Sequence, residues 1–410
     1  MSRRSHSSPL LPFPERSERK GSSRAKGPPL KVAGLFAGIG GVELGLRQAG
    51  HESTLLCEIE PGAQAVLKKR FRGIALHDDV TTLKALPRDI ELLTGGFPCQ
   101  DLSQAGQTAG ILKGTRSSLV GEVFRLIRRH EVPWVLLENV PFMLKLDSGR
   151  AMSLLADAFE ELGYAWAYRV VNSMAFGVPQ RRERVLFLAS RCGDPREVLF
   201  ADEVEEPQVA PDQVGRLACG FYWTEGARGL GWAVDAVPTL KGGSTIGIPS
   251  PPAILLPDGT LGTPDIRDAE RMQGFAEDWT SPSSMVAKAG HRWKLIGNAV
   301  TVDVFKWVGE RLRRPDPDGA SLAGTRIVIG RGWPRAGWNV GDGRFGREFS
   351  TYPVFVDRPA LGGWLHHPLK PLSVRAARGF LTRAEGSSLR FPPGLLASIR
   401  AHVAALSQAS

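Results

Sequence analysis

The chain has 410 residues, of which 42% are hydrophobic and 23% are charged, and its formal net charge is +10. This length exceeds the roughly 100 to 200 residues of one domain, so we expect a principal domain with additions. No run of about 18 apolar residues marks a membrane span, and the first residues lack the apolar core of a secretory signal. We therefore expect a monomer in the cytoplasm, without a membrane partner.

Basic residues are concentrated at the two ends of the chain. Residues 1–31 carry a net charge of +6 and residues 313–410 carry +8, which leaves −4 for the middle. The total charge favours a polyanionic partner. The part of the chain between the two ends is slightly acidic.

Four cysteines, Cys57, Cys99, Cys192 and Cys219, lie far apart and form no Cys-x-x-Cys pair. This spacing argues against a disulfide framework and against a zinc cluster. We expect reduced thiols and no bound metal.

The first 190 residues divide into a tail and a regular domain. Residues 1–29 are rich in Ser, Arg and Pro, which predicts a disordered basic tail. In residues 30–190, short apolar runs alternate with segments of helical spacing. The alternation indicates an α/β fold with a mostly parallel, doubly wound sheet, in which ligands bind at the carboxyl ends of strands. The expected strands are 31–38, 53–60, 90–97, 134–140 and 184–190, and the expected helices are 42–50, 62–71, 119–130 and 153–163.

The second half of the chain is less regular. Residues 191–266 are dominated by Gly, Pro and irregular stretches, which predicts a small, loop-rich insert. Helical spacing returns in residues 267–312, which we assign to the principal domain. The sequence DPDG at 316–319 marks a linker within the basic extension 313–410, and residues 371–406 of that extension suggest two helices.

A glycine-rich sequence, LFAGIGG at 35–41, ends the first expected strand and leads into a helix. Glycines there let the backbone approach a ligand at a helix N-terminus, and an acid about 20 residues on, Glu58, can accept ribose hydroxyls. Taken alone, the pattern fits any nucleoside cofactor. A tight turn without a ligand is the alternative.

Cys99 lies in Gly95-Gly96-Phe97-Pro98-Cys99-Gln100, on the loop after the strand at 90–97. A lone free cysteine is usually buried and unreactive. Because this one follows a strand and is flanked by Pro and Gly, we interpret it as a nucleophile.

A carboxylate and two arginines accompany the cysteine. Glu138 ends the next strand, and Arg182 and Arg184 stand at or before the start of a later one. An arginine-rich run is more often a solvated face. A thiol, a carboxyl group and a guanidinium group nevertheless suit an aromatic, amide-like ring that must be activated for conjugate addition.

In these motifs and in their order, the sequence resembles the DNA (cytosine-5) methyltransferase family of bacterial restriction-modification systems. The matching motifs run from Phe36 to Val300, about two thirds of the chain, and comprise LFAGIGG, GGFPCQ, ENV, QRRER, RDAERMQGF and GNAV. The resemblance implies a Rossmann-like fold that depends on S-adenosylmethionine, with the insert 191–266 as a target-recognition domain.

The resemblance also implies a role for each site residue. Cys99 would add to C6 of cytosine, and Glu138 would contact N3 and the 4-amino group. Arg184 would bind O2, with Arg182 supporting the same loop. The residues implied around S-adenosylmethionine are Phe36, Ile39, Gly41, Glu58, Ile59, Asp79, Pro98, Leu119, Asn298 and Val300. Among them Asp79 would contact the adenine amino group, and Ile59 stands where a larger aromatic residue is often found.

Double-stranded DNA is the implied substrate, and the target cytosine must leave the base stack to expose C6. Thr239 and Leu240 resemble the family's recurring Thr-Leu pair in the recognition region. The bases that are read depend on side-chain placement in the groove. A cognate restriction endonuclease acting on the same site is a further implied partner.

Two other functions remain open. One is an RNA cytosine-5 methyltransferase, against which the Phe97-Pro98-Cys99 form and an insert of about 75 residues argue. The other is a DNA-binding relative without catalysis, against which the intact residues Cys99, Glu138 and Arg184 argue.

The role of the extension 313–410 is also open. Its charge and its tryptophans Trp333, Trp338 and Trp364 permit phosphate binding, with Arg375 and Arg378 as candidate contacts. Packing against the catalytic domain is an equal alternative.

Overall fold

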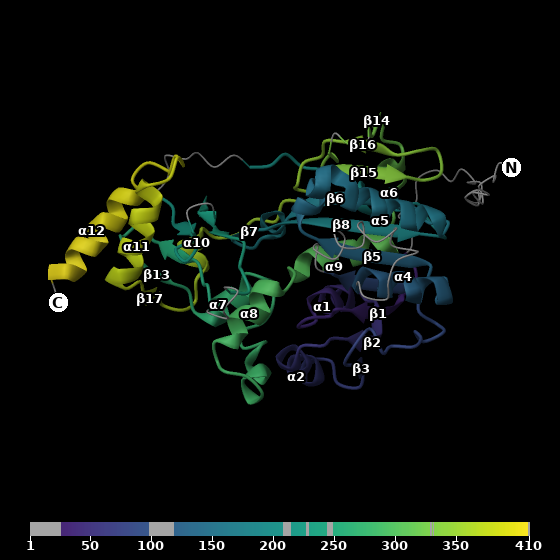
Figure 1. The fold of residues 1–410 in the computed structure, drawn as a ribbon, viewed down its shortest axis with the longest axis horizontal. Helices are drawn as coiled ribbons and strands as arrows, with labels where there is room; N and C mark the ends of the chain where they lie inside the picture. Colours follow the sequence, from purple (N-terminus) through teal and green to yellow (C-terminus); the bar gives the residue numbers. More distant parts are fainter. Residues whose placement is uncertain are drawn as a thin grey trace.

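The computed structural model describes residues 26–97, 119–207, 215–226, 229–243, 249–328, 330 and 332–408. Two lobes lie side by side, a large lobe built on one long sheet and a small lobe that ends in the C-terminal helices (Figure 1). No described helix is long and apolar enough to cross a membrane.

The large lobe is built on a ten-stranded sheet in the order β14-β16-β15-β6-β8-β5-β4-β1-β2-β3. Neighbours from β3 to β5 pair in parallel, and those from β5 to β14 pair in antiparallel fashion, so seven of the ten strands run in one direction. This confirms the α/β class. The strands are β1 Lys31–Leu35, β2 Glu52–Cys57, β3 Ala75–His77, β4 Leu92–Gly96, β5 Trp134–Asn139, β6 Ala165–Asn172, β8 Glu183–Ser190, β14 Thr325–Arg326, β15 Ala336–Asn339 and β16 Phe345–Arg347.

Helices cover both faces of this sheet. On one face, α4 (Leu119–His130) and α5 (Arg150–Glu161) bury apolar side chains against the strands. On the other face, α1 (Gly41–Gln48) packs against α9 (Val302–Arg313). Each helix has a buried apolar stripe, as expected for helices that cover a sheet. The other helical elements in the described part of this lobe are α2 Pro61–Arg70, η1 Pro141–Leu144, η2 Leu146–Gly149, η3 Ser173–Phe176, α6 Arg196–Leu199 and η7 Pro317–Ala320.

The small lobe is built on an antiparallel sheet in the order β10-β9-β12-β13-β17. Its strands are β9 Cys219–Phe221, β10 Trp232–Val234, β12 Ala253–Leu255, β13 Leu261–Thr263 and β17 Lys370–Pro371. The first four belong to the expected insert, whereas β17 belongs to the C-terminal extension. Between the lobes lie the paired strands β7 Gln180–Arg181 and β11 Val237–Pro238, and the helical elements α7 Ile266–Arg271, η6 Ser281–Met285 and α8 His291–Asn298.

The extension, whose role the sequence left open, contributes to both lobes. Its strands β14, β15 and β16 continue the large sheet beyond β6. Further on, α10 (Leu361–Trp364), α11 (Val374–Glu385) and α12 (Leu395–Gln408) belong to the small lobe, with α12 at its outer end (Figure 1). The side chains of α11 share a core with the insert sheet, where Phe380 lies 4.6 Å from Phe221 between ring centroids.

The tryptophans of the extension are packing residues. Trp333 and Trp338 are 8% and 2% exposed and belong to the cores of the large lobe. The Arg271 guanidinium lies over the Trp364 ring, with its central carbon 4.0 Å from the ring centroid. The expectation that these rings help to bind phosphate is therefore wrong for Trp333 and Trp338, because buried rings are withdrawn from any ligand. Phosphate contacts by Arg375 and Arg378, both exposed, stay a prediction.

Gly27 to Pro29, which the sequence assigned to a disordered tail, lie within the described structure. Gly27, inside the expected tail, donates its amide to the Arg313 carbonyl at 2.7 Å, and Arg313 Nε donates back to the Gly27 carbonyl at 2.9 Å. This reciprocal contact fixes the entry to β1 against the end of α9.

Removing the aromatic ring of Phe380 tests whether the C-terminal helices belong to the core of the small lobe. Phe380→Ala should lower the free energy of unfolding of this lobe by about 3 to 5 kcal/mol, since the ring is fully buried. Denaturant unfolding followed by circular dichroism measures the loss, and Phe380→Leu, which keeps most of the volume, should lose much less. A loss below about 1 kcal/mol for Phe380→Ala would mean that the helices only lie on the surface.

Candidate active site

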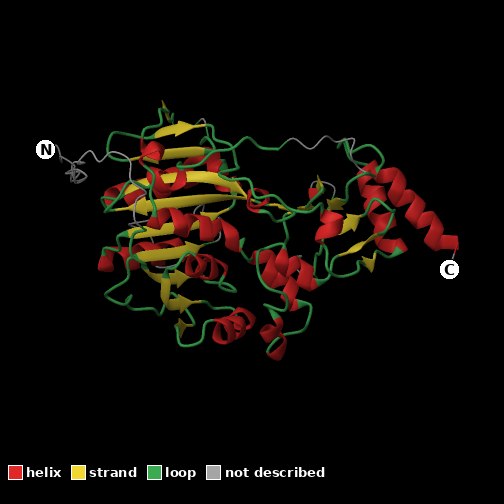
Figure 2. Cartoon of the chain, turned by 180° about the vertical axis from the view of Figure 1, so that it is seen from behind, coloured by secondary structure: helices red, strands yellow, loops and turns green. Residues whose placement is uncertain are grey.

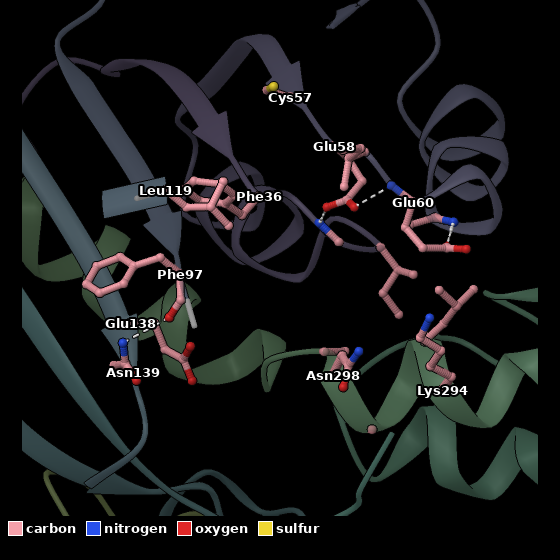
Figure 3. A pocket seen from close by; sticks show the side chains of 18 of the residues that line it. Phe36, Cys57, Glu58, Glu60, Phe97, Leu119, Glu138, Asn139, Lys294 and Asn298 are labelled. Atoms are coloured by element: carbon pink, nitrogen blue, oxygen red, sulfur yellow. Dashed lines mark hydrogen bonds between the residues drawn. The ribbon is translucent and has the colours of Figure 1, made fainter. Parts of the chain in front are cut away.

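A pocket of about 680 Å³ lies where β1, β2, β4 and β5 end. Most strands of the large sheet point toward the small lobe, so these carboxyl ends face it (Figure 2). In Figure 3, Glu58 and Glu60 lie on one side of the pocket, Phe97 and Glu138 on another, and Asn298 and Lys294 come from α8. The pocket therefore has walls from separate parts of the chain, as the open edge of a doubly wound sheet allows.

The glycine-rich turn after β1 forms the first wall. Phe36 has a left-handed backbone with φ 54, and its side chain lines the pocket. A Cβ on Gly41 would lie 2.8 Å from Cγ2 of Val300, so only glycine lets the α9 segment approach this closely. A non-glycine residue held at positive φ is strained, and such strain is typical of functional sites.

Glu58, just beyond the end of β2, has a fixed carboxylate. It accepts hydrogen bonds from the amides of Gly38 at 2.7 Å and of Glu60 at 2.9 Å. Glu60 in turn accepts from the Ala63 amide at the start of α2 and contacts His291 Nε2 at 2.8 Å. The glycine turn, the start of α2 and α8 are thus joined through two carboxylates.

The neighbouring wall is formed by Ile59, Asp79 and Leu119. Ile59 is 69% exposed, so its apolar surface is open to the pocket. Asp79 accepts hydrogen bonds from the amide and the hydroxyl of Thr81, both at 2.8 Å, and these bonds lower the pKa of its carboxyl group. An exposed apolar side chain beside a carboxylate acceptor suits a planar heterocycle with an amino group.

Glu138 and Arg184 form an ion pair at the far side of the pocket. Arg184 Nε lies 2.7 Å from Glu138 Oε1, and the side chains are 16% and 13% exposed. Burial lowers the pKa of Arg184, and the charge of Glu138 opposes that effect. A largely buried carboxylate and guanidinium are therefore held ready for a polar ring.

Arg182 is 2% exposed, and its guanidinium holds two loops together instead of facing solvent. Its guanidinium donates to the carbonyls of Leu240 and Ala299. Thr239 Oγ1 donates to the Arg181 carbonyl at 2.9 Å, and the Leu240 amide donates to Gln180 Oε1 at 2.9 Å. The Thr239-Leu240 segment is therefore hydrogen-bonded directly to β7, at Arg181 and Gln180.

Asn139 supports the start of the loop that follows β4. Its Nδ2 donates to the Phe97 carbonyl at 2.9 Å, while its Oδ1 accepts from the Val140 amide at 2.8 Å. Phe97 is the last described residue before that loop, and the predicted residues Pro98 and Cys99 lie outside the described residues.

Nearly all the described residues that the sequence predicted for the site meet around this pocket. Phe36, Ile39, Glu58, Ile59, Asp79, Leu119, Glu138, Arg182, Arg184 and Asn298 line it, and Gly41 and Val300 line a small adjoining cavity. Leu240 accepts a hydrogen bond from Arg182, and Thr239 donates one to the Arg181 carbonyl.

Sequence reasoning missed Asn139, Glu60 and Lys294, which also belong to this region. Asn139 and Glu60 directly follow the predicted site residues Glu138 and Ile59. Lys294 precedes Asn298 by four positions, and helical residues with this spacing share a face. This spacing would have pointed to Lys294 had the helix α8 been predicted.

Comparison with known proteins gives consistent matches. The family model described as C-5 cytosine-specific DNA methylase matches residues 30–218. The chain is 48% identical over 366 residues to the Type II methyltransferase M2.BsuMI of Bacillus subtilis (strain 168), covering 87% of this chain and 93% of that protein. It is 28% identical over 315 residues to the Type II methyltransferase M.Bsp6I of Bacillus sp. (strain RFL6), covering 69% and 98%. The Dnmt2 methyltransferase structure from S. pombe overlaps with a TM-score of 0.47 at 16% identity, covering 72% and 100%.

Exchanging Asn139 for aspartate tests its support of Phe97. Asn139→Asp keeps the side-chain shape and the oxygen that accepts from the Val140 amide, but it removes the donor. The Phe97 carbonyl then loses its hydrogen-bond partner and faces a carboxylate. The free energy of unfolding should fall by about 1 to 3 kcal/mol at pH 8. The fall should be smaller at pH 5, where the aspartate can take up a proton and donate again. Equal stability of the variant and the parent protein at both pH values would contradict this support.

Proposed function

Since the chain belongs to the C-5 cytosine-specific DNA methylases and is a DNA cytosine-5 methyltransferase of the Type II kind, we propose that it acts by a covalent adduct between Cys99 and C6 of a cytosine flipped out of duplex DNA. The observation that carries this mechanism is the Glu138–Arg184 pair, 2.7 Å apart beside Phe97, which precedes Cys99 by two residues. A nucleophile and a ring-binding pair are thereby expected at one edge of the sheet.

Each polar group of the pair has a task on the cytosine ring. Glu138 faces N3 and the 4-amino group, and Arg184 holds O2, where negative charge develops as the ring loses aromaticity. Charge stabilisation by preorganised groups in a largely buried site is usually a large part of catalysis. Attack by the Cys99 thiolate on C6 then makes C5 nucleophilic, and loss of the C5 proton followed by loss of the sulfur restores the ring.

The pocket residues fit S-adenosylmethionine. The Glu58 carboxylate, held by two backbone amides, suits ribose hydroxyls, and Asp79 suits the adenine amino group. The Phe36 ring and the exposed Ile59 side chain supply apolar surface for the base. Gly41, which has no room for a Cβ beside Val300, keeps the turn close to Asn298 and the rest of that segment. When bound, the cofactor supplies an electrophilic methyl group.

The two lobes suggest how DNA is held. The small lobe faces the carboxyl edge of the large sheet, so a duplex lying between them would present the target base to the pocket. Thr239 and Leu240, which are hydrogen-bonded to β7, would bring the recognition lobe to the flipped nucleotide. The Type II names of the relatives support a cognate endonuclease that cuts the same sequence.

Bisulfite sequencing tests the activity directly. Plasmid DNA from cells that express the protein should carry protected cytosines at one recurring sequence, which also identifies the target. Cys99→Ser should leave every site unprotected while duplex binding persists, because a hydroxyl is a far poorer nucleophile toward C6.

Trapping with 5-fluorocytosine checks the role of Cys99 separately. Fluorine at C5 cannot leave as a proton, so DNA that carries it at the target should form a complex that resists denaturation. An active enzyme without such a complex would exclude the covalent mechanism.

Glu58 provides the test of the cofactor site. Glu58→Ala should raise the dissociation constant of S-adenosylmethionine about ten- to hundredfold, in keeping with about 1 to 3 kcal/mol for lost hydrogen bonds to a buried ligand. Calorimetry measures the constant, and the methylated sequence should not change, because the recognition lobe is remote from Glu58. Unchanged cofactor binding would show that the ribose lies elsewhere.

A further inference from the structure

A second, smaller cavity of about 70 Å³ adjoins the pocket, and two carboxyl groups reach it. One belongs to Glu138. The other belongs to Glu43 in the first turn of α1, a residue that the mechanism above does not use. The side chain of Glu43 is 1% exposed, which is rare for a glutamate without a basic partner.

Glycines in the sheet make room for both carboxyl groups. A Cβ on Gly34 of β1 would collide with the Glu43 carboxyl, and a Cβ on Gly96 of β4 would lie 3.2 Å from Glu138 Oε2. Each acid therefore lies directly over a strand position that has no side chain.

The two acids approach the same face of the sheet. Gly34 pairs with Thr94 of β4, and Gly96 pairs with Glu138 of β5. Thr94 and Gly96 are two residues apart, so their side-chain directions are the same, and the two positions are about 7 Å apart along β4. The Glu43 carboxyl group, over β1, is consequently one strand across and one pleat repeat along from the Glu138 carboxyl group, over β4, and both residues line the small cavity.

Two buried polar atoms near this cavity are poorly satisfied by the protein. Within the described part of the chain, neither Glu43 Oε2 nor Thr94 Oγ1 makes a hydrogen bond of normal geometry, although both are buried. Buried polar groups are nearly always bonded to protein or to ordered water. A cavity of this volume has room for one or two water molecules, each of which takes about 30 Å³ in the liquid. Water in the cavity would connect the two carboxyl groups.

The Glu138 carboxylate is ion-paired with Arg184. A carboxylate can only accept hydrogen bonds, whereas N3 needs a donor when the ring takes up the electron pair. Burial, helped by the charge of Glu58, raises the pKa of Glu43 to about 7, while Thr94 lowers it. A substantial share of Glu43 is therefore a carboxylic acid at neutral pH.

We propose that Glu43 supplies, through water in this cavity and through Glu138, the proton that N3 takes up when Cys99 adds to C6. This inference rests on the proposed function and deepens it. As the sulfur–C6 bond forms and the ring electron pair moves to N3, Glu43 gives its proton through the water to the Glu138 carboxylate, and Glu138 passes a proton to N3. Glu43 is left as the carboxylate, and Glu138 is a carboxylate again. After C5 has been methylated and has lost its proton to solvent, the sulfur leaves and N3 returns its proton by the same route. Glu43 acts through Glu138 and does not touch the base.

The surroundings of Glu43 contain few other groups that could take this part. Glu58 after β2 and Glu138 on β5 are the charged groups that face it from the sheet. Near Gly45, α9 approaches α1 through Val302 and Phe305 and through the backbone of Lys306.

Single-turnover methylation measured across pH tests the proposal. The rate of the parent protein should fall as pH rises through about 7, because the acid form of Glu43 is lost. Glu43→Gln keeps the shape but cannot carry the proton, so its rate should be about a hundredfold lower and this falling limb should vanish. Binding of DNA and of S-adenosylmethionine should not change. Glu122→Gln, a buried glutamate of α4 outside both cavities, should keep the parent pH profile.

The outcomes separate this inference from the proposed function. If Glu43→Gln keeps the rate and the pH profile of the parent protein, and the parent protein forms the 5-fluorocytosine adduct, only the role of Glu43 is overturned. Lack of the adduct in the parent protein would overturn both. If Glu43→Gln does not fold, Thr94→Val decides, because removal of a hydroxyl that lowers the pKa of Glu43 should move the falling limb to higher pH. If the falling limb of the pH profile of Thr94→Val stays at the pH of the parent protein, the proposal is rejected.

Discussion

The antiparallel pairing of β8 with β5 is the constraint on which the site depends. β5 ends at the pocket with Glu138 and Asn139, and β8, running the other way, begins there just before Arg184. If β8 were parallel to β5, its start would lie at the opposite edge of the sheet, about 25 Å away for eight residues. The ion pair at 2.7 Å is thus a consequence of strand direction.

The same reversal connects the insert with the pocket. Because β8 starts at the pocket, the preceding strand β7 also lies there, and it pairs with β11 of the insert. Arg182 then lies between two loops, with its guanidinium on the carbonyls of Leu240 and Ala299. A buried guanidinium needs such acceptors, since an unpaired buried charge is costly. Movement of the loop at Leu240 would therefore be transmitted to the loop at Ala299, which lines the pocket.

The C-terminal extension completes both lobes. β15 pairs with β6, which would otherwise be an exposed sheet edge, and Arg344 fixes the new strands to α5 through Asp157 and Glu160. Between the lobes, Arg358 forms an ion pair with Asp235 at 3.1 Å. Farther on, α11 fills the core of the insert sheet. In its described residues the insert contributes only four short strands to this sheet, and a sheet that small needs a covering layer to be stable.

The sequence by itself determined the α/β class, the predicted strands and helices of residues 30–190, the two C-terminal helices and most of the pocket residues. The helices and strands follow from local patterns, because apolar periodicity and glycine turns are set by neighbouring residues, whereas most of the pocket residues follow from the resemblance of the ordered motifs to the family. Only the tertiary structure decided the direction of β8, the division of the extension between two lobes and the burial of Trp333 and Trp338. It also brought Glu43 beside the cavity lined by Glu138. Such features depend on contacts between residues far apart in the chain, for which a single sequence carries no local signal.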